Sequence, residues 1–220
     1  MFDAPSSMAV SSRLTIVRLL RSRVPPMVEI SRRRAIEDVA SELFRAHGYA
    51  ATSVRDIARV LEIQGPSLYA HVTSKEAVLW AIVDRAAARF EAAAEAATRA
   101  TGIDPVEAMA ALVRAHVRVI TDDVGAAAVF VHEWRALGPD RRSAVLERRD
   151  AYERRFREVI ETGIAGGDFE MTDPALAATA VLSTLNGIPG WYRPDGRLPA
   201  GRVADHFVDL VLRMLQGASR

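Results

Sequence analysis

The sequence predicts an all-α protein of about nine helices, with an N-terminal three-helix helix-turn-helix domain and a larger C-terminal helical domain. Apolar residues recur at every third or fourth position through most of the chain after residue 31, which is the period of an α-helix. Prolines, glycines and capping residues separate these periodic stretches. No stretch alternates convincingly with the period of a strand, so we expect no sheet.

Composition excludes several classes of function. The 220 residues are 50% hydrophobic, which supplies enough apolar surface for a core, and the net charge is only +1. Any basic surface for nucleic acid must therefore be local. The chain has no cysteine, which excludes disulfides, thiolate metal sites and cysteine nucleophiles and fits a reducing cytoplasm. No apolar run approaches the roughly 20 residues of a membrane span.

Residues 1–28 differ from the rest because they are rich in Ser, Pro and Arg, contain few acids and show no sustained period. We expect a disordered basic extension. The alternative is an ordered basic arm that touches DNA phosphate or the minor groove.

The sequence predicts that residues 29–76 form the helix-turn-helix domain. Ser31 can cap a first helix that ends at Gly48, and Thr52 or Ser53 can cap a second helix, where Asp56 in the first turn suits the helix dipole. Pro66 suits the first turn of a short third helix that runs to about residue 72. A fourth helix follows from a Ser74 cap and opens the second domain, residues 77–220.

Helix-breaking and helix-capping residues divide this second domain into further helices. Asp-Pro pairs open two helices, and Gly-Pro and Gly-Gly pairs end others. The predicted helices cover residues 105–120, 124–137, 140–163, 174–186 and 200–216, with a proline-containing loop at 188–199.

Residues 33–79 resemble the TetR family of bacterial regulators. The residues that carry the resemblance are Ala35, Ala40, Leu43, Phe44, His47-Gly48-Tyr49, Ala51 to Ala58, Ser67-Leu68-Tyr69, His71-Val72 and Ser74-Lys75-Glu76. The resemblance implies that the third helix enters the major groove, and that Tyr69, His71 and Lys75 meet backbone phosphate.

The helical pattern agrees, since Leu68 and Val72 would face inward and leave a polar surface outside. The candidate DNA-binding residues are Arg33, Thr52, Ser53, Gln64, Gly65, Ser67, Tyr69, His71 and Lys75. For each of them the alternative is plain packing or a solvated surface. Two departures from the family, Glu62 in place of a turn glycine and Gly65 near a usual lysine, bear on which operator is read.

The resemblance also implies dimerisation through the last two helices, because one such module makes few base contacts. The candidate interface residues are Leu176, Ala180, Leu185, Phe207, Leu210 and Met214. The alternative is that these residues form intramolecular core.

The middle helices of this family enclose a mostly apolar cavity. The candidate ligand-binding residues are Phe90, Met109, His116, Phe130, Trp134, Asn186 and Trp191, each of which could equally be core. The arginine-rich stretch 141–157 is either a solvated face or a cationic rim for an anionic ligand.

The expected function is therefore a homodimeric repressor that binds palindromic operator DNA and is released by a small-molecule inducer. The segment 191–198 resembles repressors of fatty-acid or sterol catabolism that respond to acyl-CoA thioesters. The alternatives are a multidrug-responsive repressor and an all-helical interaction module without DNA binding. The sequence has no second His after His132-Glu133, no glycine-rich phosphate loop and no metal cluster, so we expect no enzyme, metal or cofactor.

Overall fold

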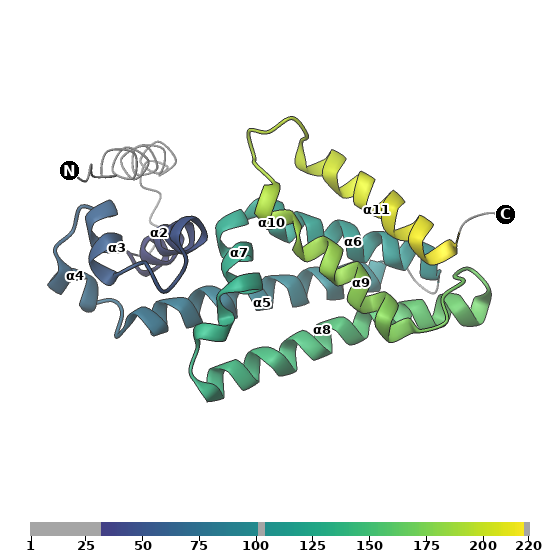
Figure 1. Ribbon diagram of the computed structural model, residues 1–220, viewed down its shortest axis with the longest axis horizontal. Coiled ribbons are helices and arrows are strands. Elements are labelled where there is room, and N and C mark those ends of the chain that lie inside the picture. The colour runs from purple at the N-terminus through teal and green to yellow at the C-terminus, as the bar shows by residue number, and fades with distance from the viewer. Residues whose placement is uncertain (1–31, 101–103, 218–220) are drawn as a thin grey trace, which may run out of the picture. The chain divides into compact units, whose positions relative to one another are not determined.

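The computed structural model describes residues 32–100 and 104–217, and within those ranges the chain forms helices joined by turns (Figure 1). The elements are α2 (Arg32–His47), α3 (Val54–Val60), α4 (Gly65–Tyr69), α5 (Lys75–Ala100), α6 (Pro105–Asp122), α7 (Val124–His132), the 3-10 helix η1 (Trp134–Ala136), α8 (Pro139–Gly166), α9 (Pro174–Asn186), α10 (Ile188–Trp191) and α11 (Ala200–Gln216). The all-α prediction is confirmed. Ser31 and the extension at 1–28 lie outside the described residues.

The chain divides into two compact units between Val78 and Leu79, inside α5, whereas the sequence analysis placed the boundary after residue 76. In the first unit, α3 packs against both α2 and α4. Its core contains Ile36 and Phe44 from α2, Ile57 from α3 and Leu68 from α4, all essentially inaccessible to solvent. One apolar face of each short helix is therefore buried in a shared core.

A capping box begins α3. The Ser53 hydroxyl accepts from the Asp56 amide at 3.2 Å, and the Asp56 carboxylate accepts from the Ser53 amide at 2.9 Å. The same carboxylate also accepts the Ser53 hydroxyl proton, and this bond lowers the pKa of Asp56. Of the two caps that the sequence left open, the structure uses Ser53.

The turn after α3 requires a left-handed residue. Glu62 has φ 56°, while the amide of Ile63 donates to Ala58 and that of Glu62 to Arg59. This pair of bonds is the Schellman ending of a helix, in which glycine normally takes the left-handed position. The Glu62 departure noted in the sequence thus lies at the one described non-glycine residue with positive φ.

Helix α4 is shorter than the predicted 66–72. Its last turn tightens, because the amide of His71 donates to Leu68 at 2.9 Å, and Ser74 then caps the next helix by accepting from Ala77 at 3.0 Å. Pro66 lies in the first turn, as its missing amide predicts. Only five residues are left as regular helix.

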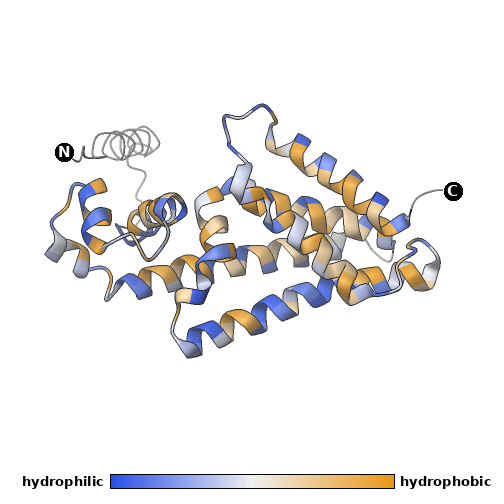
Figure 2. Ribbon diagram, viewed as in Figure 1, coloured by the Kyte–Doolittle hydropathy of each residue, from blue (hydrophilic) through white to orange (hydrophobic). Residues whose placement is uncertain are grey.

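The second unit is built around α6, which packs against α7, α8, α9, α10 and α11. Nine residues of α6 are buried, including Met109, Leu112 and His116. By contrast, α8 is strongly hydrophilic over its first half and more apolar toward its end (Figure 2). No helix in the described ranges is both long and apolar enough to cross a membrane.

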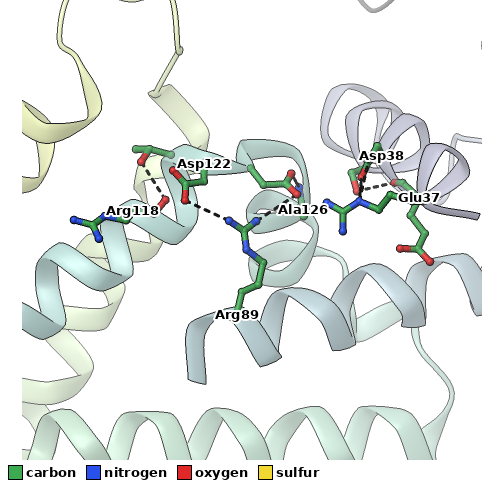
Figure 3. Close-up of polar contacts among 10 residues, drawn as sticks. Glu37, Asp38, Arg89, Arg118, Asp122 and Ala126 are labelled. Carbon is green, nitrogen blue, oxygen red and sulfur yellow. Dashed lines mark hydrogen bonds and ion pairs between the residues drawn. The ribbon is translucent and has the colours of Figure 1, made fainter. Parts of the chain in front are cut away.

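Charged residues fix the junction between α6 and α7 (Figure 3). Arg89 of α5 lies 3.4 Å from Asp122 and 3.5 Å from Asp123, and the Asp123 carboxylate also caps α7 by accepting from Ala126. The predicted helix 124–137 is interrupted after residue 132, where the chain turns into η1. The predicted loop 188–199 begins with the single turn α10, in which Pro189 takes an early helical position.

The Glu62 conformation generates a stability prediction. We expect Glu62→Gly to be more stable than Glu62→Ala by about 1 kcal/mol, because both lose the carboxylate but only glycine adopts positive φ without strain. Urea unfolding of the two variants measures the difference. Equal stability of the two variants would show that the left-handed conformation carries no cost.

Candidate functional site

The exposed surface of the first unit gathers around α4. Tyr69 is 56% exposed although it is a large aromatic residue, and its neighbours Ser67 and His71 are exposed as well. Leu68, between them, is completely buried. Gln64 is exposed just before the helix and Gly65 is half-buried at its start. A short helix thus offers hydroxyl, imidazole and amide groups of the kind that bind phosphates and base edges.

Thr52 is not available for this surface. It is only 3% exposed, and its hydroxyl donates to the carbonyl of Gly48 at 2.9 Å and approaches that of Leu43 at 3.4 Å. The prediction that its hydroxyl meets phosphate is therefore wrong, because the hydroxyl satisfies buried carbonyls at the end of α2. Ser53 is exposed, but its hydroxyl is engaged with Asp56 in the capping box.

Lys75, the only lysine in the chain, points back into its own domain. Its ammonium donates to the carbonyls of Tyr49 at 2.8 Å and Thr52 at 2.9 Å and lies 4.1 Å from the centre of the Tyr49 ring. These contacts join the start of α5 to the turn between α2 and α3. The family resemblance instead implied that this lysine meets phosphate, so the structure gives it a different partner.

Arg33 and Arg55 differ in whether an acidic side chain pairs with them. Arg33 is exposed but lies 3.4 Å from Glu37, one turn along α2. Arg55, at the second position of α3, is exposed, and no acidic side chain in the described residues pairs with it. Sequence reasoning missed Arg55. Its place two residues after the Ser53 cap, on the helix that packs against α4, was the available signal.

The second unit contains a cavity of about 220 Å³ among α5, α6, α7, α8 and α9. Its lining residues are Phe90, His116, Phe130, Arg149, Asp150, Tyr152, Glu153, Thr179, Leu182, Ser183 and Asn186. The structure thus brings together four of the predicted ligand-binding residues, namely Phe90, His116, Phe130 and Asn186. Apart from Asn186, and from Arg149 within the arginine-rich stretch, the α8 and α9 residues of the lining were missed because they are interspersed with solvent-facing residues.

Three predicted ligand-binding residues lie elsewhere, and for this cavity the prediction is wrong. Met109 is fully buried in the core and Trp134 packs beneath the cavity wall, so neither lines it. Trp191 is 51% exposed and stacks on Phe207, with ring centres 6.2 Å apart. These residues were assigned to the cavity because they are large and apolar, and that property does not distinguish a residue of the core from one that lines the cavity.

A buried imidazole lies at the centre of the cavity wall. His116 is 3% exposed, shares a 3.0 Å hydrogen bond with Tyr152 through Nδ1, and packs 4.7 Å from the Phe90 ring centre. Its Nε2 has no partner of hydrogen-bond geometry in the described residues. Burial, with a smaller contribution from the charge of Arg149, outweighs the opposing interaction with the Asn186 side chain and lowers the pKa of His116 to about 3, so the ring is neutral. Burial likewise raises the pKa of Tyr152.

A guanidinium lies beside this imidazole. Arg149 is stacked 5.4 Å from the Phe130 ring centre and 5.5 Å from that of Trp134, whose other contact is Arg135 at 4.6 Å. Burial and the like charge of Arg135 lower the pKa of Arg149, and Asp150 offsets this only in part. No described carboxylate forms an ion pair with Arg149. The neighbouring Arg148 is instead tied to Glu91 and Asp84 of α5, at 2.6 and 2.7 Å.

Two family models match the chain. Residues 36–82 match the model of bacterial regulatory proteins of the tetR family, and residues 102–215 match that of the tetracyclin repressor-like C-terminal domain. The chain belongs to the TetR family. It is accordingly a DNA-binding transcriptional regulator and not an enzyme.

Relatives of this TetR-family regulator are similar along most of their length. The transcriptional repressor KstR2 of Rhodococcus jostii is 30% identical over 82% of this chain and 89% of its own. The structure of the ketosteroid transcriptional regulator KstR2 of Mycobacterium tuberculosis superposes with a TM-score of 0.80 at 27% identity, covering 89% of this chain and all of that one. AibR in complex with isovaleryl coenzyme A and operator DNA gives a TM-score of 0.72 at 27% identity, covering 84% and 98%.

The TetR-family regulator exposes large apolar side chains on its last helices. Leu176 of α9 is 66% exposed and Leu210 of α11 is 52% exposed, while Ala180, Phe207 and Met214 are half-buried. These residues, together with Trp191, are here called the α9–α11 face. Leu185 is completely buried, so its prediction as an interface residue is wrong. It occupies the inward side of α9, where the core and the outer face alternate.

The neutral state of His116 generates a pH prediction. The unfolded chain takes up a proton near pH 6.5 and the folded one only near pH 3, so the imidazole's contribution is complete above pH 7 and is lost as the pH falls. Between pH 7 and 5 the free energy of unfolding should drop by about 2 kcal/mol from this group alone.

Urea unfolding of the TetR-family regulator and its His116→Phe variant at both pH values measures this drop, which the variant should lack. The exposed His132, substituted in the same way, provides the matched control and should retain it. An equal pH dependence in wild type and His116→Phe would contradict the assignment.

Proposed function

We propose that this chain is a homodimeric repressor that binds palindromic operator DNA in the cytoplasm and is released by an acyl-CoA thioester. The observation that carries the proposal is the exposed polar surface of α4 on a buried Leu68. A helix anchored by one apolar residue, with hydroxyl and imidazole groups outside, suits entry into the major groove. Arg55 and the predicted residues Gln64, Ser67, Tyr69 and His71 are the proposed contacts.

The α9–α11 face supports the homodimer. Leu176, Trp191 and Leu210 are three of the large apolar residues that the described chain leaves open to solvent. Apolar side chains gathered on one surface are stabilised when a second copy covers them. Two copies would supply the two recognition helices that a palindrome requires.

The cavity supports the thioester. Its 220 Å³ accommodates an acyl group but not coenzyme A, so the nucleotide part would lie outside, where arginines of α8 can meet its phosphates. AibR, which has a similar fold, is described in complex with isovaleryl coenzyme A and operator DNA. The cationic Arg149 on the lining weighs against the multidrug alternative, because a cationic drug would be repelled there.

Helix α5 offers a route for release. It begins at Lys75, which contacts the turn before α3, and fifteen residues further on it presents Phe90 to the cavity. Release requires that the ligand bind one state of the protein better than the other, and the coupling must be reciprocal. A ligand that displaces Phe90 would move α5. The first residue of α5, Lys75, contacts the turn between α2 and α3 in the DNA-binding domain.

Operator binding with and without thioester tests the proposal. Fluorescence anisotropy with the DNA upstream of the gene should show tight binding that Tyr69→Ala weakens by about tenfold, since one good contact contributes about 1–3 kcal/mol. Arg118→Met, on an exposed position of α6, should bind as wild type does. Hexanoyl-CoA should reduce the affinity of the wild type for DNA. Unchanged affinity in Tyr69→Ala, or no effect of any thioester, would contradict the corresponding half of the proposal.

A further inference from the structure

We propose that the ligand of the cavity carries a carboxylate that Arg149 and His116 bind, on a compact apolar body that lies against Phe90 and Phe130. This inference rests on the proposed function, in that it takes the cavity as the inducer site, and it names the chemistry of the group that enters. Arg149, His116 and both phenylalanines line the same cavity.

The first argument is the charge of Arg149. Its guanidinium is partly buried and lies over the rings of Phe130 and Trp134. The like charge of Arg135 acts on its pKa more strongly than the opposite charge of Asp150, and no carboxylate in the described chain forms an ion pair with it. A buried cation without a counter-ion is costly, because desolvation is not offset by an attraction. A neutral carbonyl would leave that charge uncompensated, whereas a carboxylate would neutralise it through two parallel hydrogen bonds.

The second argument is the free nitrogen of His116. The ring is neutral, so one nitrogen carries a proton and the other accepts. The hydroxyl of Tyr152 is a better donor than acceptor, and its bond to Nδ1 therefore places the proton on Nε2. That N–H is buried near Asn186, whose side chain interacts with the imidazole and lines the same cavity, but no described acceptor meets it in hydrogen-bond geometry. A ligand carboxylate would supply an acceptor for this N–H as well as a negative charge.

The size of the cavity limits the rest of the ligand. A cavity of about 150 Å³ holds benzene, so 220 Å³ has room for one ring or a short chain with its carboxylate. Phe90 and Phe130 stack 5.3 Å apart and form the apolar part of the wall. The body that fits is small and apolar.

Asp150 and Glu153 also line the cavity, and they are the groups that would repel a carboxylate. Asp150 is exposed, and its effect on the pKa of Arg149 is smaller than that of Arg135. Glu153 lies 3.9 Å from Arg157 on the next turn of α8. Neither acid forms an ion pair with Arg149, so neither takes the place of a ligand carboxylate there.

The carboxylate has two possible sources, a free aromatic or aliphatic acid and the far end of a dicarboxylic acid whose other end is a thioester. Calorimetric titration of the full-length wild-type protein distinguishes these two sources by comparing ligands in pairs, each a carboxylate and its uncharged match. Phenylacetate is compared with phenylacetamide, and adipyl-CoA with hexanoyl-CoA, which differ in charge at constant size or chain length. At least one carboxylate should bind at least about tenfold more tightly than its uncharged match, since a charge-assisted bond contributes about 1.5–3 kcal/mol.

Arg149→Met keeps the packing on Phe130 and Trp134 and should abolish that preference, while Arg118→Met should keep it. The wild-type comparison does not depend on the variant's folding. Release of DNA by hexanoyl-CoA as readily as by adipyl-CoA, with no preference for phenylacetate, would overturn the inference and leave the proposed function intact. Binding of neither carboxylate would also overturn it. Absence of DNA binding in the ligand-free protein would instead refute the proposed function, whatever the titrations show.

Discussion

The position of one five-residue helix is the constraint on which the DNA-binding surface depends. An isolated helix of five residues is unstable in water, because nucleation costs more than its few hydrogen bonds return. Helix α4 is held instead by Leu68, which is fully buried and contributes about 2 kcal/mol through its apolar area. The turn between α2 and α3 is held to the start of α5 by Lys75, through two carbonyls and the Tyr49 ring. These contacts leave Ser67, Tyr69 and His71 at the surface in a fixed arrangement.

The second unit, which contains the cavity, differs from the first in how well its buried polar groups are satisfied. In the described part of the first unit, a buried polar group such as the hydroxyl of Thr52 has a hydrogen-bond partner. In the second unit, no described atom meets the Nε2 of His116 in hydrogen-bond geometry, although Asn186 interacts with the ring, and no described carboxylate forms an ion pair with Arg149. Unsatisfied donors reduce the stability of the empty protein and increase its discrimination among ligands, because only an acceptor of suitable charge removes the penalty.

The sequence was sufficient for the fold, the family and the exposed helix, because each depends on local pattern. The period of apolar residues, the Ser53 cap, Pro66 and the inward position of Leu68 all follow from a few neighbouring residues. Glu62 was recognised as a residue in a glycine's place, and its φ of 56° agrees.

Partners distant in sequence could not be predicted in this way. Lys75 meets residues 23 and 26 positions earlier, and His116 meets Tyr152 36 positions later, so neither contact has a local signal. Met109 was assigned by residue type and Leu185 by helical spacing, and both proved to be core, whereas Arg149 was one arginine among several on α8. Only packing shows which of those arginines faces inward.

Lys75 fixes the start of α5, directly after α4, to the turn between α2 and α3. That it does this instead of binding DNA itself is tested most directly by amide hydrogen exchange in the ligand-free protein. Removing the ammonium in Lys75→Met should speed exchange at Leu68 and Val72 by at least about tenfold, with little change in α2, and operator affinity should fall with it. Unchanged exchange at α4 together with lost affinity would contradict the account, because it would mean that Lys75 acts on the phosphate backbone.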